Sequence, residues 1–464
     1  MKKRVLSVLM ACVMVLTTAC GGAVKNESTS GTSTEGSDVA EVSEMTEDGK
    51  MNIEVWNIWT GNGGDCLQQI ADEFNASQDK YHVTLTFSGT YAETFAKYQA
   101  TASGNRPDAV MASTEYVAFF ADNPEYYVPA QKYIDEDNYD ITDLMPNLIS
   151  AYTDANGDMM CIPFGNTVVG FWYNTEVLEA AGIDPVNDLD SLEEIGKACE
   201  KLKANGVEYP VYLPQNSIFY TFPITSEGID YVDNENGKAD ICTASLIDEE
   251  PLASVTSKYF KFIQDCQAKG ELASRDLTSS DVRQMFVDGK IAIMFSTISV
   301  LTYIGEQCNW EVEFGFHPSP TVSEGAENVG QCTSGGALFI SNNGDEERER
   351  GVWEFLKCLM EPENAAAFAM STGYLPITKA GYETEEYQNF ITEYFPTAIY
   401  SIEAQNATRE DCYNAFLPMF ADFHEIVIEY TDKVINDLSY EPEKATKDFA
   451  AAVNESIELY NLSR

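Results

Sequence analysis

The order of strand and helix signals from residue 51 onward is the feature that most limits the fold of this chain. Residues 53–55 alternate in polarity like a strand, and residues 67–74 then place apolar side chains at helical spacing. Residues 83–87 alternate as a second strand, 92–103 indicate a helix, and 109–111 follow as a third strand. Because this β-α-β-α-β order requires crossover connections, it predicts a mostly parallel sheet with helices on both faces.

Ligands of such sheets bind at the carboxyl ends of the strands. The loops at those ends are predicted at 57–64, 88–91 and 113–116. A second unit begins after Pro163, where the capping box of residues 191–194 opens another amphipathic helix. The pattern therefore favours two α/β lobes over one large sheet.

The N-terminus is typical of an exported chain. A basic start is followed by an apolar run over residues 5–16, which is too short to span a bilayer, and then by Cys20. This arrangement resembles a bacterial lipoprotein signal, although Thr17 stands where that signal usually has leucine. The resemblance implies a signal peptide over 1–19 and lipidation at Cys20. Residues 20–50 are expected to form the lipid anchor and a disordered tether, because they are rich in Ser, Thr, Gly and Glu. The alternative is simple secretion.

Charge narrows the range of partners. The chain has 28 Lys+Arg against 75 Asp+Glu, a formal net charge of −47, so nucleic acid and anionic membrane surfaces are poor partners. Its 3 histidines, His82, His317 and His424, lie far apart in the sequence, and we therefore expect no metal site and no cofactor. The membrane is expected to be reached only through the lipid anchor.

The cysteines do not form a recognisable framework. Of 11, Cys12 lies in the signal and Cys20 is the lipid site, which leaves nine that are scattered singly without a C-x-x-C spacing. We expect these nine to be buried free thiols that pack like small hydrophobic side chains.

Six motifs occur in an order that is informative as a set. In chain order they are Gly104 to Asp108, Pro163-Phe164-Gly165-Asn166 followed by Phe171-Trp172-Tyr173-Asn174, Phe286 to Met294, Gly335-Gly336, Pro362 to Ala366, and Thr372 to Thr378. From residue 51 onward the chain resembles family 1 of the extracellular solute-binding proteins of ABC importers. The segments 362–366 and 372–378 are closest to the branch that binds glycerol 3-phosphate.

This resemblance implies a two-lobe periplasmic-binding-protein-like fold of type II. Each lobe is expected to be a mostly parallel sheet flanked by helices, and a hinge joins the two lobes. We expect lobe I to comprise 51–163 and 311–341, and lobe II to comprise 164–310 and 342–464. The resemblance also implies a monomeric receptor rather than an enzyme, held at the extracellular face of the bacterial membrane. Its partners would be ABC permease subunits with a separate ATPase, since the chain has no G-x-x-x-x-G-K-[ST] motif.

Aromatic residues decide the expected class of ligand, because sugar rings stack their C–H faces on flat side chains and offer hydroxyls to polar groups. For the aromatic residues ordinary packing is the alternative, and Trp172 alternates with Phe171 in a way that favours the core. The candidate site residues are Trp59, Tyr91, Glu115, Tyr116, Asn166, Trp172, Tyr220, Gly335, Gly336 and Tyr374.

A phosphorylated ligand would require a cationic cluster or a helix N-terminus. Ala421 stands where the glycerol 3-phosphate branch has an arginine, and Phe219 and Tyr220 replace its second-lobe tryptophans. We therefore expect a neutral sugar or oligosaccharide. The alternatives are a phosphorylated polyol such as glycerol 3-phosphate, or a surface-tethered glycan hydrolase that uses two carboxylates.

Overall fold

The computed structural model describes residues 44–47 and 49–464, which fall in one compact unit. The predicted signal peptide, Cys20 and most of the predicted tether lie outside the described residues. Within the described ranges, no helix combines the length and the apolar character needed to cross a bilayer.

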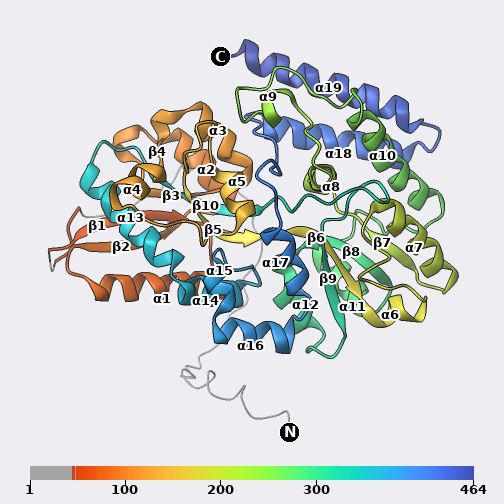
Figure 1. The fold of residues 1–464 in the computed structure, drawn as a ribbon, viewed down its shortest axis with the longest axis horizontal. Helices are drawn as coiled ribbons and strands as arrows, with labels where there is room; N and C mark the ends of the chain where they lie inside the picture. Colours follow the sequence, from red (N-terminus) through yellow and green to blue (C-terminus); the bar gives the residue numbers. More distant parts are fainter. Residues whose placement is uncertain (1–43, 48) are drawn as a thin grey trace, which may run out of the picture. The chain divides into compact units, whose positions relative to one another are not determined.

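Two sheets organise the described chain (Figure 1). The first has the order β2-β1-β3-β10-β4, with β5 paired to β10. Its strands are β1 (Met51–Asn57), β2 (Tyr81–Phe87), β3 (Ala109–Ser113), β4 (Tyr127–Val128), β5 (Ile162–Thr167) and β10 (Ser334–Ser341). The second has the order β7-β8-β6-β9. Its strands are β6 (Val169–Asn174), β7 (Tyr209–Tyr212), β8 (Ile291–Thr297) and β9 (Phe314–Pro318).

Strand direction confirms one part of the prediction and corrects another. Strands β1, β2 and β3 are parallel, as the β-α-β-α-β pattern requires. However, β10 is antiparallel to β3, β4 and β5, and in the second sheet only the β7–β8 pair is parallel. The expectation of two mostly parallel sheets is therefore wrong in this detail. Strands β6 and β10 enter from the other sheet instead of from a helical crossover, so the crossover rule does not set their direction.

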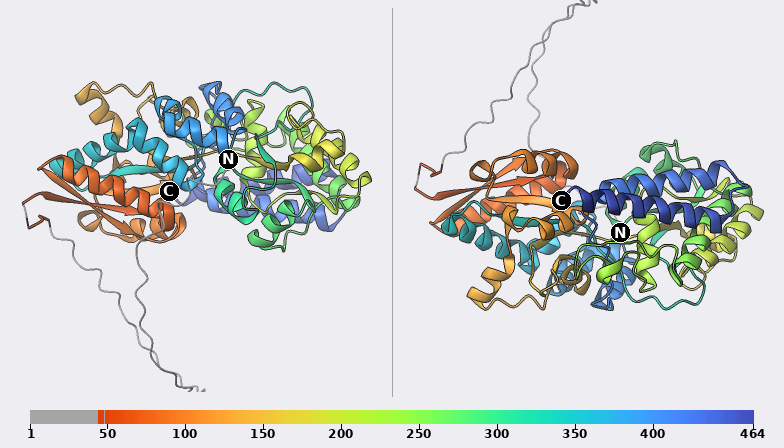
Figure 2. Two further views of the ribbon diagram at one scale, coloured as in Figure 1. Left: turned by 90° about the horizontal axis from the view of Figure 1, so that it is seen from below. Right: turned by 90° about the horizontal axis from the view of Figure 1, so that it is seen from above.

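Helices cover both sheets. Those around the first sheet are α1 (Gly61–Ser77), α2 (Tyr91–Ala100), α3 (Val117–Asp122), α4 (Ala130–Asp137), α5 (Pro146–Tyr152), α13 (Glu346–Met360), α14 (Pro362–Thr372), α15 (Lys379–Glu383) and α16 (Glu385–Tyr394). Those around the second are α6 (Thr175–Ala180), α7 (Leu192–Ala204), α8 (Ile218–Ser226), α9 (Asp233–Asn236), α10 (Leu252–Ala268), α11 (Ser279–Val287), α12 (Leu301–Gln307), α18 (Phe420–Asn436) and α19 (Pro442–Leu462). Helices α18 and α19 lie side by side (Figures 1 and 2).

Local spacing explains the helices that the sequence predicts. In α1 the apolar positions Leu67, Ile70 and Phe74 are all buried, so this face packs inward. Helix α7 begins at the predicted cap, where Ser191 Oγ accepts a hydrogen bond from the Glu194 backbone N–H at 3.2 Å.

The chain passes between the sheets more than once. It crosses from β5 to β6, returns from β9 to β10, and meets both parts again through α17 (Ala398–Asn406), which contacts α5 and β9. Our expectation assigns 311–341 to lobe I and 342–464 to lobe II. The structure instead places β9 in the second sheet and packs α13 against β1 and β10 of the first. These long-range pairings are not visible in local sequence patterns.

The nine cysteines of the described chain are free thiols, of which only Cys66 and Cys358 are half-buried and the other seven are buried. Burial raises the pKa of the Cys66 thiol and raises that of Cys358 to about 11. Burial also raises the pKa of the Cys161 thiol well above its usual value.

Thiol labelling tests this arrangement. We expect an aromatic disulfide reagent at neutral pH to modify only Cys66 and Cys358 in the native protein, and to do so slowly, because the reactive thiolate is disfavoured at both. After denaturation all nine should react, and peptide mass spectrometry identifies the modified positions. Rapid native labelling of Cys161 would contradict the burial described here.

Candidate ligand-binding site between the two sheets

Side chains from the ends of the first three strands meet the start of β10. Trp59 follows β1, Tyr91 begins α2 after β2, and Glu115 follows β3. Gly336 of β10 pairs with Ser113, the last residue of β3. A Cβ atom on Gly336 would overlap the Tyr91 hydroxyl, so the glycine lets this ring lie against the backbone. The predicted loops and the glycine pair therefore come together.

The neighbouring Gly335 has a different role. Its backbone has φ +111°, a value that favours glycine, and a Cβ atom there would overlap the Gly165 carbonyl. Gly335 thus permits the close pairing of β10 with β5, and it shapes the site only through the backbone.

Aromatic rings form one wall of the site. The Trp59 ring meets the Tyr374 ring edge to face, with centroids 5.1 Å apart, and it meets Phe368 in the same way at 5.1 Å. The position of a Cβ atom on Gly165 lies 3.6 Å from Trp59, 3.7 Å from Tyr374 and 3.6 Å from the Gly336 nitrogen. Because Gly165 has no side chain, Trp59, Tyr374 and the Gly336 nitrogen can all lie close to its backbone.

Several polar atoms in this region are buried without a hydrogen-bond partner. They include Trp59 Nε1 and the hydroxyls of Tyr91 and Tyr152. Burial raises the pKa of both tyrosines well above the usual value, and Tyr374 adds to both shifts. Buried polar groups are normally paired, so donors left free beside an aromatic wall are suited to the hydroxyls of a ligand.

Tyr152 is a residue that sequence reasoning missed. It is the last residue of α5 and is fully buried. Nothing in the local sequence pattern marks Tyr152, because it ends a short helix. Only the packing of α5 beside β5 brings it near Tyr91 and Tyr374.

Lysine and arginine of the described chain do not contribute to the pKa shifts of the site's titratable groups, although Lys238 Nζ lies 5.8 Å from the ring centre of Phe416. Within the described residues, no Lys or Arg side chain shifts the pKa of Tyr91, Glu115, Tyr152 or Tyr374. Burial raises the pKa of Glu115, and this effect is opposed by a hydrogen bond from Ser113 and by His424. An environment of this kind disfavours a dianion.

Elements of the second sheet complete the site. Following α14, Gly373 lies against the 3₁₀ turn η4 (Ile298–Val300) that follows β8: a Cβ atom on Gly373 would be 3.1 Å from the Ser299 carbonyl oxygen. Burial raises the pKa of Tyr374 to about 12, and a hydrogen bond with Ser299 opposes this shift. Tyr374 thus contacts groups that belong to both sheets.

A cavity of about 20 Å³ is lined by Glu115 and Thr333 together with Phe416 and Phe420. Pockets that hold small ligands usually measure about 300–1,000 Å³. Entry of a sugar therefore requires the groups on the two sides to move apart.

The structure places two predicted site residues in the core instead. Trp172 is fully buried, stacks on Phe395 at 5.3 Å and donates its indole N–H to the Thr297 carbonyl at 3.0 Å. Tyr220 is fully buried in the second hydrophobic core, and its hydroxyl bonds Thr256 Oγ1 at 2.9 Å. The burial of Trp172 agrees with the alternation with Phe171 that favours the core. The polar atoms of both candidates already have protein partners.

Asn166 and Tyr116 occupy intermediate positions. The Asn166 side chain is buried and donates to Gln405 Oε1 at 2.7 Å and to the Pro376 carbonyl at 3.1 Å. It therefore ties β5 to α17 near the crossing between the sheets. Tyr116 is half-buried and stacks on Phe95 at 3.9 Å.

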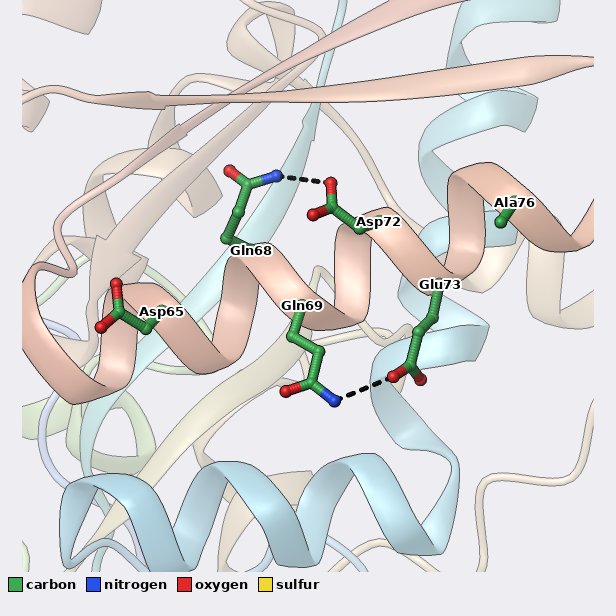
Figure 3. A pocket seen from close by; sticks show the side chains of 6 residues that line it. All are labelled: Asp65, Gln68, Gln69, Asp72, Glu73 and Ala76. Carbon is green, nitrogen blue, oxygen red and sulfur yellow. Dashed lines mark hydrogen bonds between the residues drawn. The ribbon is translucent and has the colours of Figure 1, made fainter. Parts of the chain in front are cut away.

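A surface depression on α1 is a different kind of feature (Figure 3). Its lining belongs to one helix, and its polar side chains pair with each other: Gln68 with Asp72 at 2.8 Å and Gln69 with Glu73 at 2.9 Å. Such i, i+4 pairs are typical of a solvated helix face.

The two sheets and their flanking helices form two lobes, and the chain passes between them more than once. With aromatic and polar groups gathered between the lobes, this arrangement is that of a two-lobe receptor for a small solute. Over residues 69–392 the sequence matches the model of the bacterial extracellular solute-binding proteins, and the chain belongs to this family. Members of this family are binding proteins. The resemblance inferred from the motifs is thereby confirmed.

Relatives of known name agree with this assignment. The chain is 27% identical over 355 residues to the sn-glycerol-3-phosphate-binding periplasmic protein UgpB of Yersinia pestis, covering 73% of this chain and 76% of that one. It is 25% identical over 351 residues to the UgpB of Rhizobium meliloti, covering 73% and 78%.

Solved structures show the same fold. The sugar-binding protein MalE from Xanthomonas citri superposes with a TM-score of 0.73 at 14% identity, covering 89% of this chain and 98% of that one. UgpB from Mycobacterium tuberculosis, in complex with glycerophosphocholine, superposes with a TM-score of 0.70 at 19% identity, covering 89% and 100%.

Proposed function

We propose that this protein captures a neutral sugar or oligosaccharide between its two lobes and delivers it to the permease of an ABC importer. The observation that carries this proposal is the set of unpaired buried donors, Trp59 Nε1 and the Tyr91 and Tyr152 hydroxyls, beside an aromatic wall. No lysine or arginine of the described chain perturbs the tyrosines or Glu115 there. Hydroxyl groups, rather than phosphate, match such a site.

Roles follow from the chemistry of each group. Trp59 and Tyr374 offer ring surface to the C–H face of a sugar, and Tyr91 donates or accepts a hydrogen bond through its hydroxyl. Glu115 accepts hydrogen bonds from sugar hydroxyls. The backbone at Gly336 lets Tyr91 approach, and Tyr116 extends the aromatic surface next to Glu115.

The two lobes are assigned by sheet membership. Lobe I comprises the first sheet with α13 and α14, and lobe II comprises the second sheet with β9, α18 and α19. The segments around 167–169 and 318–334 then act as the hinge. Closure is driven by ligand contacts that only the closed arrangement makes on both sides.

Placement in the cell follows from the N-terminal sequence. We assign residues 1–19 to a signal peptide and Cys20 to lipid attachment, so that the receptor works as a monomer tethered to the extracellular face of the membrane. The permease subunits and their ATPase are separate chains.

A glycerol phosphate compound is the second candidate ligand, because the relatives named above are glycerol-3-phosphate-binding proteins. Isothermal titration of the body from residue 51 with maltotriose and with glycerol 3-phosphate separates the two candidates. Binding of maltotriose supports the proposal, whereas binding of glycerol 3-phosphate alone would overturn the ligand class. Release of reducing ends from maltotriose would favour a hydrolase instead.

Tyr374→Ala is expected to weaken maltotriose binding about tenfold, because it removes a ring that contacts Trp59 and reaches toward Ser299. The side chain is only partly buried, so the melting temperature of the free protein should change little. Titration calorimetry and a melting curve check the two statements. Tyr126→Ala is the matched control, since this half-buried ring lies under Arg106 on lobe I. Unchanged affinity in the Tyr374 variant would remove this residue from the site.

A further inference from the structure

The second-sheet side of the small cavity is formed by the start of α18. Phe420, the first residue of this helix, lines the cavity together with Glu115, which comes from the opposite side. His424 follows one helical turn later, and its ring lies 6.2 Å from that of Phe420. Residues four apart share a helix face, so Phe420 and His424 point to the same region.

A buried serine holds the imidazole in place. Ser217, which precedes α8, is fully buried, and its Oγ lies 2.9 Å from His424 Nδ1. This contact occupies one ring nitrogen. Among the described residues, Nε2 of His424 has no hydrogen-bond partner, and the side chain is only half-buried. The ring is therefore oriented and still has one nitrogen available for a ligand.

Glu115, an acidic group whose pKa this imidazole affects, follows β3 of the first sheet. Glu115 is held by a single hydrogen bond, from Ser113 Oγ at 3.3 Å. Phe420, which shares a helix face with His424, lines the cavity with Glu115, and His424 lowers the pKa of Glu115 against the raising effect of burial. Glu115 thus lines the cavity from lobe I, and on lobe II His424 adjoins Phe420, which lines the same cavity.

We propose that His424 is a ligand-binding residue that acts opposite Glu115, so that the two side chains hold adjacent hydroxyls of one sugar from the two lobes. This inference rests on the proposed function and identifies the lobe II group that recognises the ligand. Glu115 accepts a hydrogen bond from one hydroxyl, and Nε2 of His424 bonds the next. Because each lobe supplies one partner, the pair forms only when the lobes close, and this gives the ligand a preference for the closed state.

Ser217 is a positioning residue in this arrangement. It contacts Nδ1 of His424, the ring nitrogen that is not offered to the ligand, and it lies just before α8. Its bond to Nδ1 fixes the orientation of Nε2, in the way that a second hydrogen bond orients a functional histidine.

Titration calorimetry with maltotriose tests the proposal. His424→Ala is expected to weaken binding about tenfold, the loss expected for one hydrogen bond to a well-placed polar group. His82→Ala is the matched control, because His82 lies in β2 and does not line the cavity. This variant should bind maltotriose as tightly as the wild type. His424→Gln retains a polar side chain and should lose less than the alanine variant, which guards against a general effect on folding.

A double-mutant cycle with Glu115→Gln sharpens the test. If both side chains hold one sugar, the factor by which maltotriose binding weakens in the double variant should be smaller than the product of the factors for the two single variants. Wild-type affinity in His424→Ala would overturn this inference and leave the proposed function standing. Failure of the wild type to bind either maltotriose or glycerol 3-phosphate would overturn the proposed function, and the inference with it. If only glycerol 3-phosphate binds, the sugar-holding role of His424 is also overturned.

Discussion

Asp108→Ala is expected to lower the free energy of unfolding by about 3–5 kcal/mol, the usual cost of removing one partner from a buried ion pair. Asp108 is 4% exposed. Its two carboxylate oxygens accept hydrogen bonds from Arg348 Nε and Nη2, both at 2.6 Å, and one also accepts from the Glu54 backbone N–H at 2.8 Å. This bidentate pair joins the loop before β3 to β1 and α13.

The same network shows why Arg348 cannot easily move to another partner when Asp108 is removed. Its Nη2 also donates to the Asn52 carbonyl at 2.8 Å, so the guanidinium is fixed between β1 and α13. Asp108 raises the pKa of Arg348, which means that the charged form is favoured in the folded state. Without this carboxylate the half-buried guanidinium would lose its bidentate partner and keep only the longer-range influence of Asp345 and Glu44.

Urea unfolding followed by circular dichroism measures the change. Asp448→Ala is the control, because Asp448 pairs with Lys444 and accepts a hydrogen bond from the Tyr440 hydroxyl on the exposed face of α19, where such contacts contribute little. A similar small loss in both variants would show that the buried pair does not anchor α13. A large loss in the Asp108 variant alone would explain the motif from Gly104 to Asp108 by stability and not by ligand contact.

Trp59→Ala is expected to weaken sugar binding about a hundredfold, since it removes both the ring platform and a free donor. The ring meets Tyr374 and Phe368, so its loss also leaves Tyr374 without support. Trp59→Phe keeps a ring but removes Nε1, which is buried without a partner, and should weaken binding only about tenfold.

Titration calorimetry with maltotriose checks this graded loss. Trp310→Ala is the control, because Trp310 is 37% exposed and packs on Tyr394 outside the cavity. Equal affinities for the Phe variant and the wild type would mean that the indole N–H does not contact the ligand. Equal affinities for the Ala variant and the wild type would remove Trp59 from the site altogether.

Some of the candidate site follows from local sequence. Trp59, Tyr91 and Glu115 come directly after predicted strands, and the parallel order of these strands brings their carboxyl ends to one edge. Tyr152 and His424 could not be found in this way. Tyr152 ends a short helix with no marked pattern, and His424 reads as one polar position on an amphipathic helix.

The sequence by itself determined the β-α-β-α-β start, the buried face of α1, the capped start of α7 and the family, because each depends on spacing within a short stretch or on motif order. Tertiary structure alone decided that β10 returns antiparallel, that α13 packs on the first sheet, and that Trp172 and Tyr220 belong to the core. The physical reason is that these outcomes depend on pairing between segments more than a hundred residues apart. Such pairing is governed by which buried surfaces and hydrogen bonds fit together, and no local pattern records it.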